Sequence, residues 1–160
     1  LTGGLLFPQQ PNGSLILRAG KTVGSSLVAQ NFVSDRYFQS RPSAANYDPR
    51  TIAGSNLAST NPVLRERIAE SSKAIAAREN IAANAIPVDM LTTSGSGIDP
   101  HISPASARVQ SARIARVRGL SAAQVQAAID ANTQAPSFGV LGQARVNVLQ
   151  LNLALDAMTP

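Results

Sequence analysis

Helix start and stop signals bracket residues 104–118. Ser103 is a good N-cap, and Pro104 suits the first helical position because the N–H group that proline lacks has no partner there. Gly119 is typical of the residue that ends a helix. One stripe of this segment carries no charge, so we expect it to face a core while the arginines point elsewhere. The stripe is Ala107, Gln110, Ile114 and Val117, and the arginines are Arg108, Arg113, Arg116 and Arg118.

Two further segments carry helix signals. Asn61-Pro62 repeats the start signal, and we expect the helix that follows to fade around residues 78–80. Ser121 with Gln124 forms a capping box, which predicts a helix over about 121–132. The apolar face of the first of these helices consists of Leu64, Ile68 and Ile75.

The first half of the chain is less regular. Short strands are predicted at 14–18 and 86–91, whereas 24–32 is compatible with a strand or a helix. Proline, glycine, asparagine and serine are so frequent in 37–62 that this segment is predicted to be a long ordered loop. A second such turn-rich segment is 134–145.

The last apolar segment, 145–156, has two interpretations. Its leucines alternate as in a strand, but Asn147 with Gln150 is compatible with another capping box. We expect a short strand that runs into a terminal helix. Together with three or four helices and no regular β–α alternation, this predicts an α+β fold, a single domain with a small sheet and long ordered loops.

Composition excludes several classes of site. The chain has no cysteine, so disulfides, thiolate metal sites and cysteine nucleophiles are impossible. Its 14 basic side chains outnumber the 9 acidic ones, a balance compatible with nucleic-acid binding, but the arginines are spread along the chain. Nucleic-acid binding is therefore only an alternative. No stretch approaches the roughly 18 consecutive apolar residues of a transmembrane helix.

The sequence TSGSGIDPHISP, residues 93–104, contains the chain's only histidine. Asp99 and His101 supply two ligands, fewer than the three protein ligands of a catalytic zinc site. The letters of a Ser-His-Asp triad are present, but there is no G-x-S-x-G elbow, and the phosphate-binding signal is weak without a Walker motif. We favour a rigid turn in which Asp99 accepts hydrogen bonds from loop N–H groups, and a small hydrolase is an alternative.

Residues 88–120 read VDMLTTSGSGIDPHISPASARVQSARIARVRGL and closely resemble the signature of the KdpC family, the C subunits of bacterial Kdp potassium-transporting ATPases. Other blocks match the family in the same order, so the resemblance covers nearly the whole chain. These blocks are FPQQPNGSLI (7–16), GSSLVAQNF (24–32), YFQSRPSAANYDP (37–49), GSNLASTNPVL (54–64) and LGQARVNVLQLNLAL (141–155).

The resemblance implies a membrane topology and partners. Members of the family carry one N-terminal transmembrane helix and an extracytoplasmic domain at the bacterial plasma (inner) membrane. That helix is absent from this chain, so we expect residues 1–8 to be the exit of the anchor and 9–160 to form one soluble extracytoplasmic domain. The implied partners are the potassium-channel-like subunit and the ATP-hydrolysing subunit, and not nucleic acid.

The resemblance also implies a non-catalytic role. The chain lacks the Asp-Lys-Thr-Gly segment that P-type ATPases phosphorylate, so it is not the hydrolytic subunit. The family is described as a catalytic chaperone that raises the ATP affinity of that subunit, which implies ATP binding at an unknown site. A second implied role is docking on the outer face of the channel-like subunit. We therefore assign no catalytic residue, no metal ligand and no covalently bound cofactor.

Two polar blocks, 37–62 and 92–104, are expected to form the docking surface. They are too polar for a core and too patterned for a linker. The alternative for each residue is that it braces the loops internally. The expected polar anchors are Arg41, Asn56, Asn61, Ser94, Ser96, Asp99 and His101.

Overall fold

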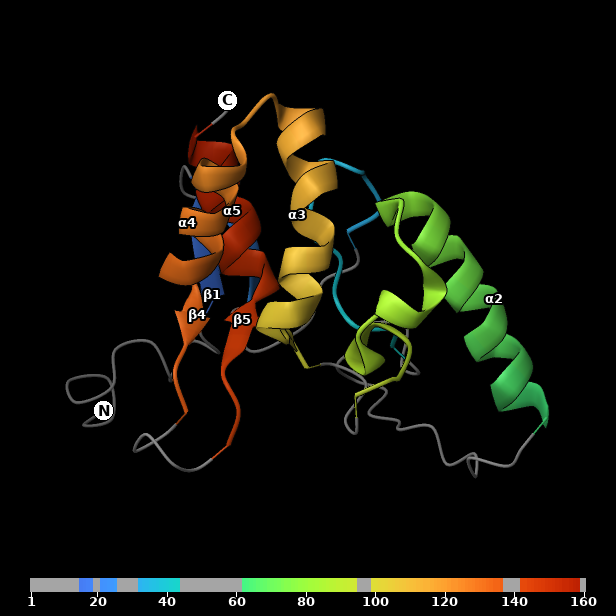
Figure 1. Ribbon diagram of the computed structural model, residues 1–160. Coiled ribbons are helices and arrows are strands. Elements are labelled where there is room, and N and C mark those ends of the chain that lie inside the picture. The colour runs from blue at the N-terminus through green and yellow to red at the C-terminus, as the bar shows by residue number, and fades with distance from the viewer. Residues whose placement is uncertain are drawn as a thin grey trace, which may run out of the picture.

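The computed structural model of the chain describes residues 15–18, 21–25, 32–43, 62–94, 99–136 and 142–158. These residues have the expected α+β architecture (Figure 1). The helices of this part of the chain are α2 (Pro62–Glu79), α3 (Pro104–Arg118), α4 (Ala122–Ala131) and α5 (Val148–Met158), together with the 3₁₀ turns η1 (Ala83–Ala85) and η2 (Val88–Met90). Its strands are β1 (Leu15–Arg18), β2 (Lys21–Ser25), β3 (His101–Ile102), β4 (Thr133–Gln134) and β5 (Arg145–Asn147).

The strands pair into two small antiparallel sheets. The first is the hairpin β1–β2, which confirms the strand predicted at 14–18. In the second sheet, β5 lies between β3 and β4, with His101 opposite Asn147 and Val146 opposite both Ile102 and Thr133. Because β3 leads to α3 and β5 runs directly into α5, this sheet fixes the N-terminal ends of both helices.

The predicted helix boundaries of α3 and α4 are confirmed. The Ser103 hydroxyl accepts a hydrogen bond from the Ser106 N–H at 3.0 Å, and Gly119 ends α3 in the left-handed conformation at φ 66°. The capping box of α4 is complete, because Ser121 and Gln124 each bond the main chain of the other.

The ends of α2 and α5 also follow the sequence. Asn80 adopts a left-handed φ of 54° just after α2, where the helix was expected to fade. The Asn147 carboxamide caps α5 by accepting from the Gln150 N–H at 3.0 Å. The segment 145–156 is therefore a short strand that runs into the terminal helix, as expected.

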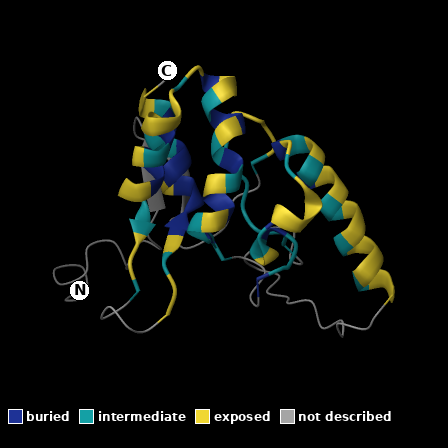
Figure 2. Ribbon diagram, in the orientation of Figure 1, coloured by how far each residue is buried: buried dark blue, intermediate teal, exposed yellow. Residues whose placement is uncertain are grey.

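The apolar core has two parts. The main cluster lies among α3, α4, α5 and β5 and consists of aliphatic residues and Phe38. A smaller cluster of Ile75, Ile86 and Met90 joins α2 and η2 to α3. Figure 2 shows the buried residues gathered among α3, α4 and α5, while α2 is exposed along much of its length. No helix within the described ranges is long and apolar enough to span a bilayer.

The strand predicted at 86–91 is wrong. This segment turns at η2, where the Met90 N–H bonds the Pro87 carbonyl and the Leu91 N–H bonds the Val88 carbonyl, both at 3.0 Å. The turn brings Asp89 to the N-terminus of α3, where a carboxylate is favoured by the helix dipole. The strand that completes the sheet is β3, inside the segment 92–104 that was predicted to be a loop.

Candidate functional site

An irregular segment, residues 35–41, crosses α3 and α5; we call it the strap. It begins in a turn in which the Tyr37 N–H bonds the Ser34 carbonyl at 3.1 Å. In Figure 1 the strap is the cyan segment that runs alongside α3. The strap packs against the core through Phe38, and its far end carries Arg41, one of the predicted anchors.

Two buried carboxamides hold the main chain of the strap. Asn152 accepts from the Phe38 N–H at 2.8 Å and donates to the Phe38 carbonyl at 3.0 Å. Gln110 does the same for Gln39, at 2.7 Å and 3.2 Å. Each carboxamide therefore satisfies both polar main-chain groups of one strap residue, in the pattern of a strand partner.

Arg113 connects the strap to the end of α2. Its Nε donates to both carboxylate oxygens of Glu79 at 3.1 Å, and its Nη1 donates to the carbonyls of Asp35 and Tyr37. Its Nη2 donates to Gln110 at 3.0 Å. The Arg113–Glu79 pair is almost completely buried, with side-chain exposures of 2% and 0%, and Arg78 Nε contacts the same Glu79 carboxylate at 2.6 Å. Glu79 therefore has two cationic partners, which offset the cost of burying its charge.

Arg118 holds the first part of the strap in a similar way. Its Nε donates to the Arg36 carbonyl at 2.7 Å, and its Nη2 donates to Asp156 on α5 at 2.8 Å. The guanidinium also lies 5.0 Å from the centre of the Tyr37 ring, a cation–π arrangement. The Tyr37 hydroxyl donates to the other Asp156 oxygen at 3.3 Å.

The burial of these arginines contradicts the sequence analysis. Arg113 and Arg118 do not point away from the core, and Val117, expected on the buried stripe, is 39% exposed. The periodicity of α3 misses this because arginine can be buried when carbonyls and carboxylates satisfy its five donors. A better signal was the position of Gln110 and Asn152 in apolar surroundings, since buried amides need main-chain partners.

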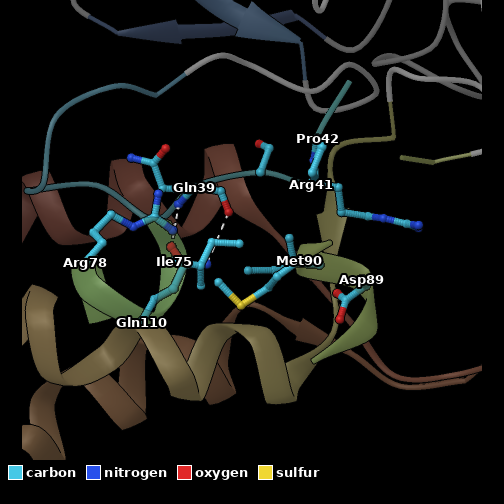
Figure 3. Close-up of a pocket in the computed structure, with 10 residues that line it drawn as sticks. Gln39, Arg41, Pro42, Ile75, Arg78, Asp89, Met90 and Gln110 are labelled. Carbon is cyan, nitrogen blue, oxygen red and sulfur yellow. Dashed lines mark hydrogen bonds between the residues drawn. The ribbon is translucent and has the colours of Figure 1, made fainter. Parts of the chain in front are cut away.

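Arg41 is bound at the other end of the strap. Its Nη2 donates to the carbonyls of Thr93 at 3.1 Å and Thr92 at 3.4 Å, just before the loop that carries Asp99. A cavity of about 160 Å³ lies beneath this part of the strap, against Ile75 and Met90. Figure 3 shows the Arg41 side chain, which also lines this cavity, extending away from Ile75 and Met90.

Asp99 and His101 form a braced turn, as expected. One carboxylate oxygen of Asp99 accepts from the His101 N–H and contacts His101 Nδ1, both at 3.0 Å. The side-chain hydrogen bond from His101 is the main cause that lowers the pKa of Asp99 below its ordinary value of 3.8, and partial burial opposes it. The hydroxyl of Ser94 accepts from the Asp99 N–H at 3.4 Å, so it braces the same turn.

Asp89 closes the turn against α3. It accepts from the Ser103 N–H at 2.8 Å, the Ser103 hydroxyl at 3.0 Å and the Ser106 hydroxyl at 2.6 Å. These donors lie at the N-terminal end of the helix, where main-chain N–H groups have no intrahelical partners. This role of Asp89 was not predicted, because the residue was expected to lie in a strand.

A cleft of about 530 Å³ brings the predicted residues Arg41, Asp99 and His101 together. Ser94 lies behind it as a brace, whereas Asn56, Asn61 and Ser96 fall outside the described residues. Among the described residues, no group of three histidines or carboxylates could hold a metal ion. The cleft surface, as we call it, also includes Val88, Asp89, Thr92, Ile102, Ser103, Gln143, Ala144 and Arg145.

Several polar side chains of the cleft surface are held in place by hydrogen bonds within the chain. The Ser94 hydroxyl accepts from the Asp99 N–H and the Ser103 hydroxyl donates to Asp89, so both serines have partners other than His101. Asp89 and Asp99 are engaged by donors of this chain, and Arg41 is fixed by two carbonyls. The hydrolase alternative remains an untested prediction.

The Asp99 turn should contribute acid-dependent stability. Because the pKa of Asp99 is lowered in the folded chain, its contribution is complete above the unfolded value of 3.8 and is lost as the pH falls below it. The Asp99 side chain is 38% exposed, so we expect at most about 1 kcal/mol. Urea unfolding below and above pH 3.8 should show this loss in the natural chain, and it should be smaller in Asp99→Asn.

Asp130→Asn is the matched control, because this carboxylate is exposed on α4. It should leave the acid dependence close to that of the natural chain. An equal acid dependence for Asp99→Asn and the natural chain would contradict the assignment.

Comparisons with known proteins agree with the resemblance. The family model described as KdpC, K+-transporting ATPase, c chain, matches residues 1–157. The chain is 54% identical over 154 residues to the potassium-transporting ATPase KdpC subunit of Shewanella putrefaciens, covering 96% of this chain and 77% of the relative. It is 56% identical over 151 residues to that of Xanthomonas campestris pv. campestris, covering 94% and 72%.

A third relative extends the match to more of the chain. The KdpC subunit of Polaromonas naphthalenivorans is 51% identical over 159 residues, which covers 98% of this chain and 81% of the relative. With a family model that spans almost every residue and relatives that are more than half identical, the chain belongs to the KdpC family.

Proposed function

We propose that this chain is a non-catalytic accessory subunit of a potassium-transporting ATPase. Family membership carries the proposal, because the curated relatives are themselves named as KdpC subunits of such an ATPase. The absence of an Asp-Lys-Thr-Gly segment from the sequence supports it, since this chain cannot then form the phosphorylated intermediate of a P-type ATPase.

The cleft surface is proposed as the docking surface for the other subunits. Its polar groups come from four separate segments, and hydrogen bonds fix Arg41, Asp89, Asp99 and His101, so little side-chain entropy is lost there when a partner binds. Val88, which is 72% exposed, adds an apolar residue to this polar surface, and Arg145 adds an exposed charge. Protein interfaces combine such apolar contacts with polar ones.

The proposal includes a position for the domain in the complex. The cleft surface faces the potassium-channel-like subunit on the extracytoplasmic side of the bacterial membrane, and residues 1–8 lead from a membrane anchor. Because ATP is cytoplasmic, an effect on the ATP affinity of the hydrolysing subunit is proposed to pass through the assembly. This proposal needs no nucleotide site on the chain.

Two substitutions at exposed positions of the cleft surface test the docking surface in the complete complex. Val88→Asp and Arg145→Glu change exposed side chains and leave the buried strap contacts intact. We expect each to reduce co-purification with the other subunits about tenfold, the loss that corresponds to ~1.4 kcal/mol of binding free energy. Potassium-dependent ATPase activity of the membranes should fall in parallel.

Matched controls are available on α2 and α3. Val63 is 65% exposed on α2, and Arg116 is exposed near the C-terminal end of α3, away from β3. Val63→Asp and Arg116→Glu should leave assembly unchanged. If the Val88 and Arg145 variants assemble as well as these controls, the cleft surface is not the docking surface, while the family assignment stands.

A further inference from the structure

The strap is bound mainly through its main chain. Donors and acceptors on α3 and α5 contact the carbonyls of residues 35–39 and the N–H groups of Phe38 and Gln39. The side chains of Asp35 and Arg36 are exposed, although their carbonyls are held. We call the groups that hold the strap the strap groove: Gln110, Arg113, Arg118, Asn152 and Asp156.

One side chain anchors the strap in the core. Phe38 is 0% exposed and packs in the main cluster, and Tyr37 adds the contact with Arg118 and Asp156. Main-chain hydrogen bonds with a pocket for one side chain are a recurrent mode of peptide recognition. The strap groove therefore has the features of a peptide receptor that holds a segment of its own chain.

The groove also requires an occupant. Gln110, Arg113 and Asn152 are buried, and without the strap their polar groups would lose the main-chain partners that offset their burial. A strap with a weakened anchor should therefore be replaced by any segment that offers the same main-chain groups and an aromatic side chain.

We propose that the strap groove is a peptide-binding site for a short main chain with one aromatic anchor, and that it accepts the strap of a second copy of this chain. In this structure the chain's own residues 35–41 fill the site. Tethering explains why: a covalently linked segment has an effective concentration on the order of millimolar, so a separate peptide competes only when the internal strap is weakened.

The test uses the whole chain carrying Phe38→Ala and a synthetic peptide of residues 32–43. The peptide should raise the melting temperature of this variant in a saturable manner and should bind it in fluorescence anisotropy. Phe38→Leu is the second variant, because it keeps an apolar anchor if the alanine variant fails to fold. Analytical ultracentrifugation of mixed Phe38→Ala and Asn152→Leu chains should show dimers in which the intact strap fills the intact groove.

Matched peptides distinguish main-chain recognition from nonspecific binding. A peptide with Asp35→Ala and Arg36→Ala should bind as well as the natural one, because only the carbonyls of these residues are used. N-methylation at Phe38 and Gln39 removes the two donors and should weaken binding at least about tenfold. Absence of binding at millimolar peptide, or equal binding of the N-methylated peptide, would overturn the proposal.

Discussion

Replacing Arg113 with methionine should destabilise the chain by about 3 kcal/mol, the lower end of the usual cost of removing one partner from a buried ion pair, because Arg78 still contacts Glu79. The substitution leaves the buried Glu79 carboxylate with one cation in place of two and deprives the carbonyls of Asp35 and Tyr37 of a donor. In a chain of this length the loss corresponds to a fall in melting temperature of about 6–12 °C. Thermal unfolding followed by circular dichroism measures it.

Arg116→Met is the matched control, because it makes the same change on the same helix at an exposed position. It should alter the stability by no more than about 0.5 kcal/mol. Adding Glu79→Gln to Arg113→Met should recover part of the loss, because the buried carboxylate that lost this cation is then replaced by a neutral amide. Equal melting temperatures for the Arg113 and Arg116 variants would contradict the conclusion that the buried contacts of Arg113 stabilise the fold.

Asn152→Leu should cost about 2–6 kcal/mol, because it leaves two buried main-chain groups of Phe38 without partners. Leucine has the branched shape of asparagine but a larger volume, so no cavity forms and any overpacking of this buried site adds to the loss. Hydrogen exchange measured by mass spectrometry should show that the amide of Phe38 loses protection, while the centre of α4 keeps it.

Gln150→Leu on the exposed side of α5 is the control for the added leucine. It should leave both the stability and the exchange of the strap unchanged. Protection at Phe38 that persists in Asn152→Leu would show that the carboxamide is not what holds the strap.

Local signals predicted the helices well, because their ends are determined within a few residues. The cap at Ser103, the left-handed Gly119 and the box of Ser121 with Gln124 all satisfy groups of their own helix. The strand wrongly predicted at 86–91 shows the limit of such signals. Asp89 binds the N-cap residue of a helix, Ser103, fourteen residues after it, and no local pattern encodes that contact.

The candidate site was predicted in part. Sequence reasoning selected Arg41, Asp99 and His101, and the structure brings them to one cleft. It did not find Arg113 or Asn152, because their partners are main-chain groups of residues 76 and 114 positions away. Almost every residue has the same main-chain N–H and carbonyl groups. The amino-acid types of the strap residues therefore do not predict which side chains bind their main chain.

The strap has a consequence for how the chain is made. Phe38 leaves the ribosome 114 residues before Asn152, the residue that must receive it. At about 5–20 residues per second, the nascent chain carries this aromatic side chain without its binding partner for roughly 6–23 s. Closing a loop of this length costs chain entropy, so we expect this contact to form late in folding. Synthesis therefore includes an interval in which holdase chaperones can bind the N-terminal third.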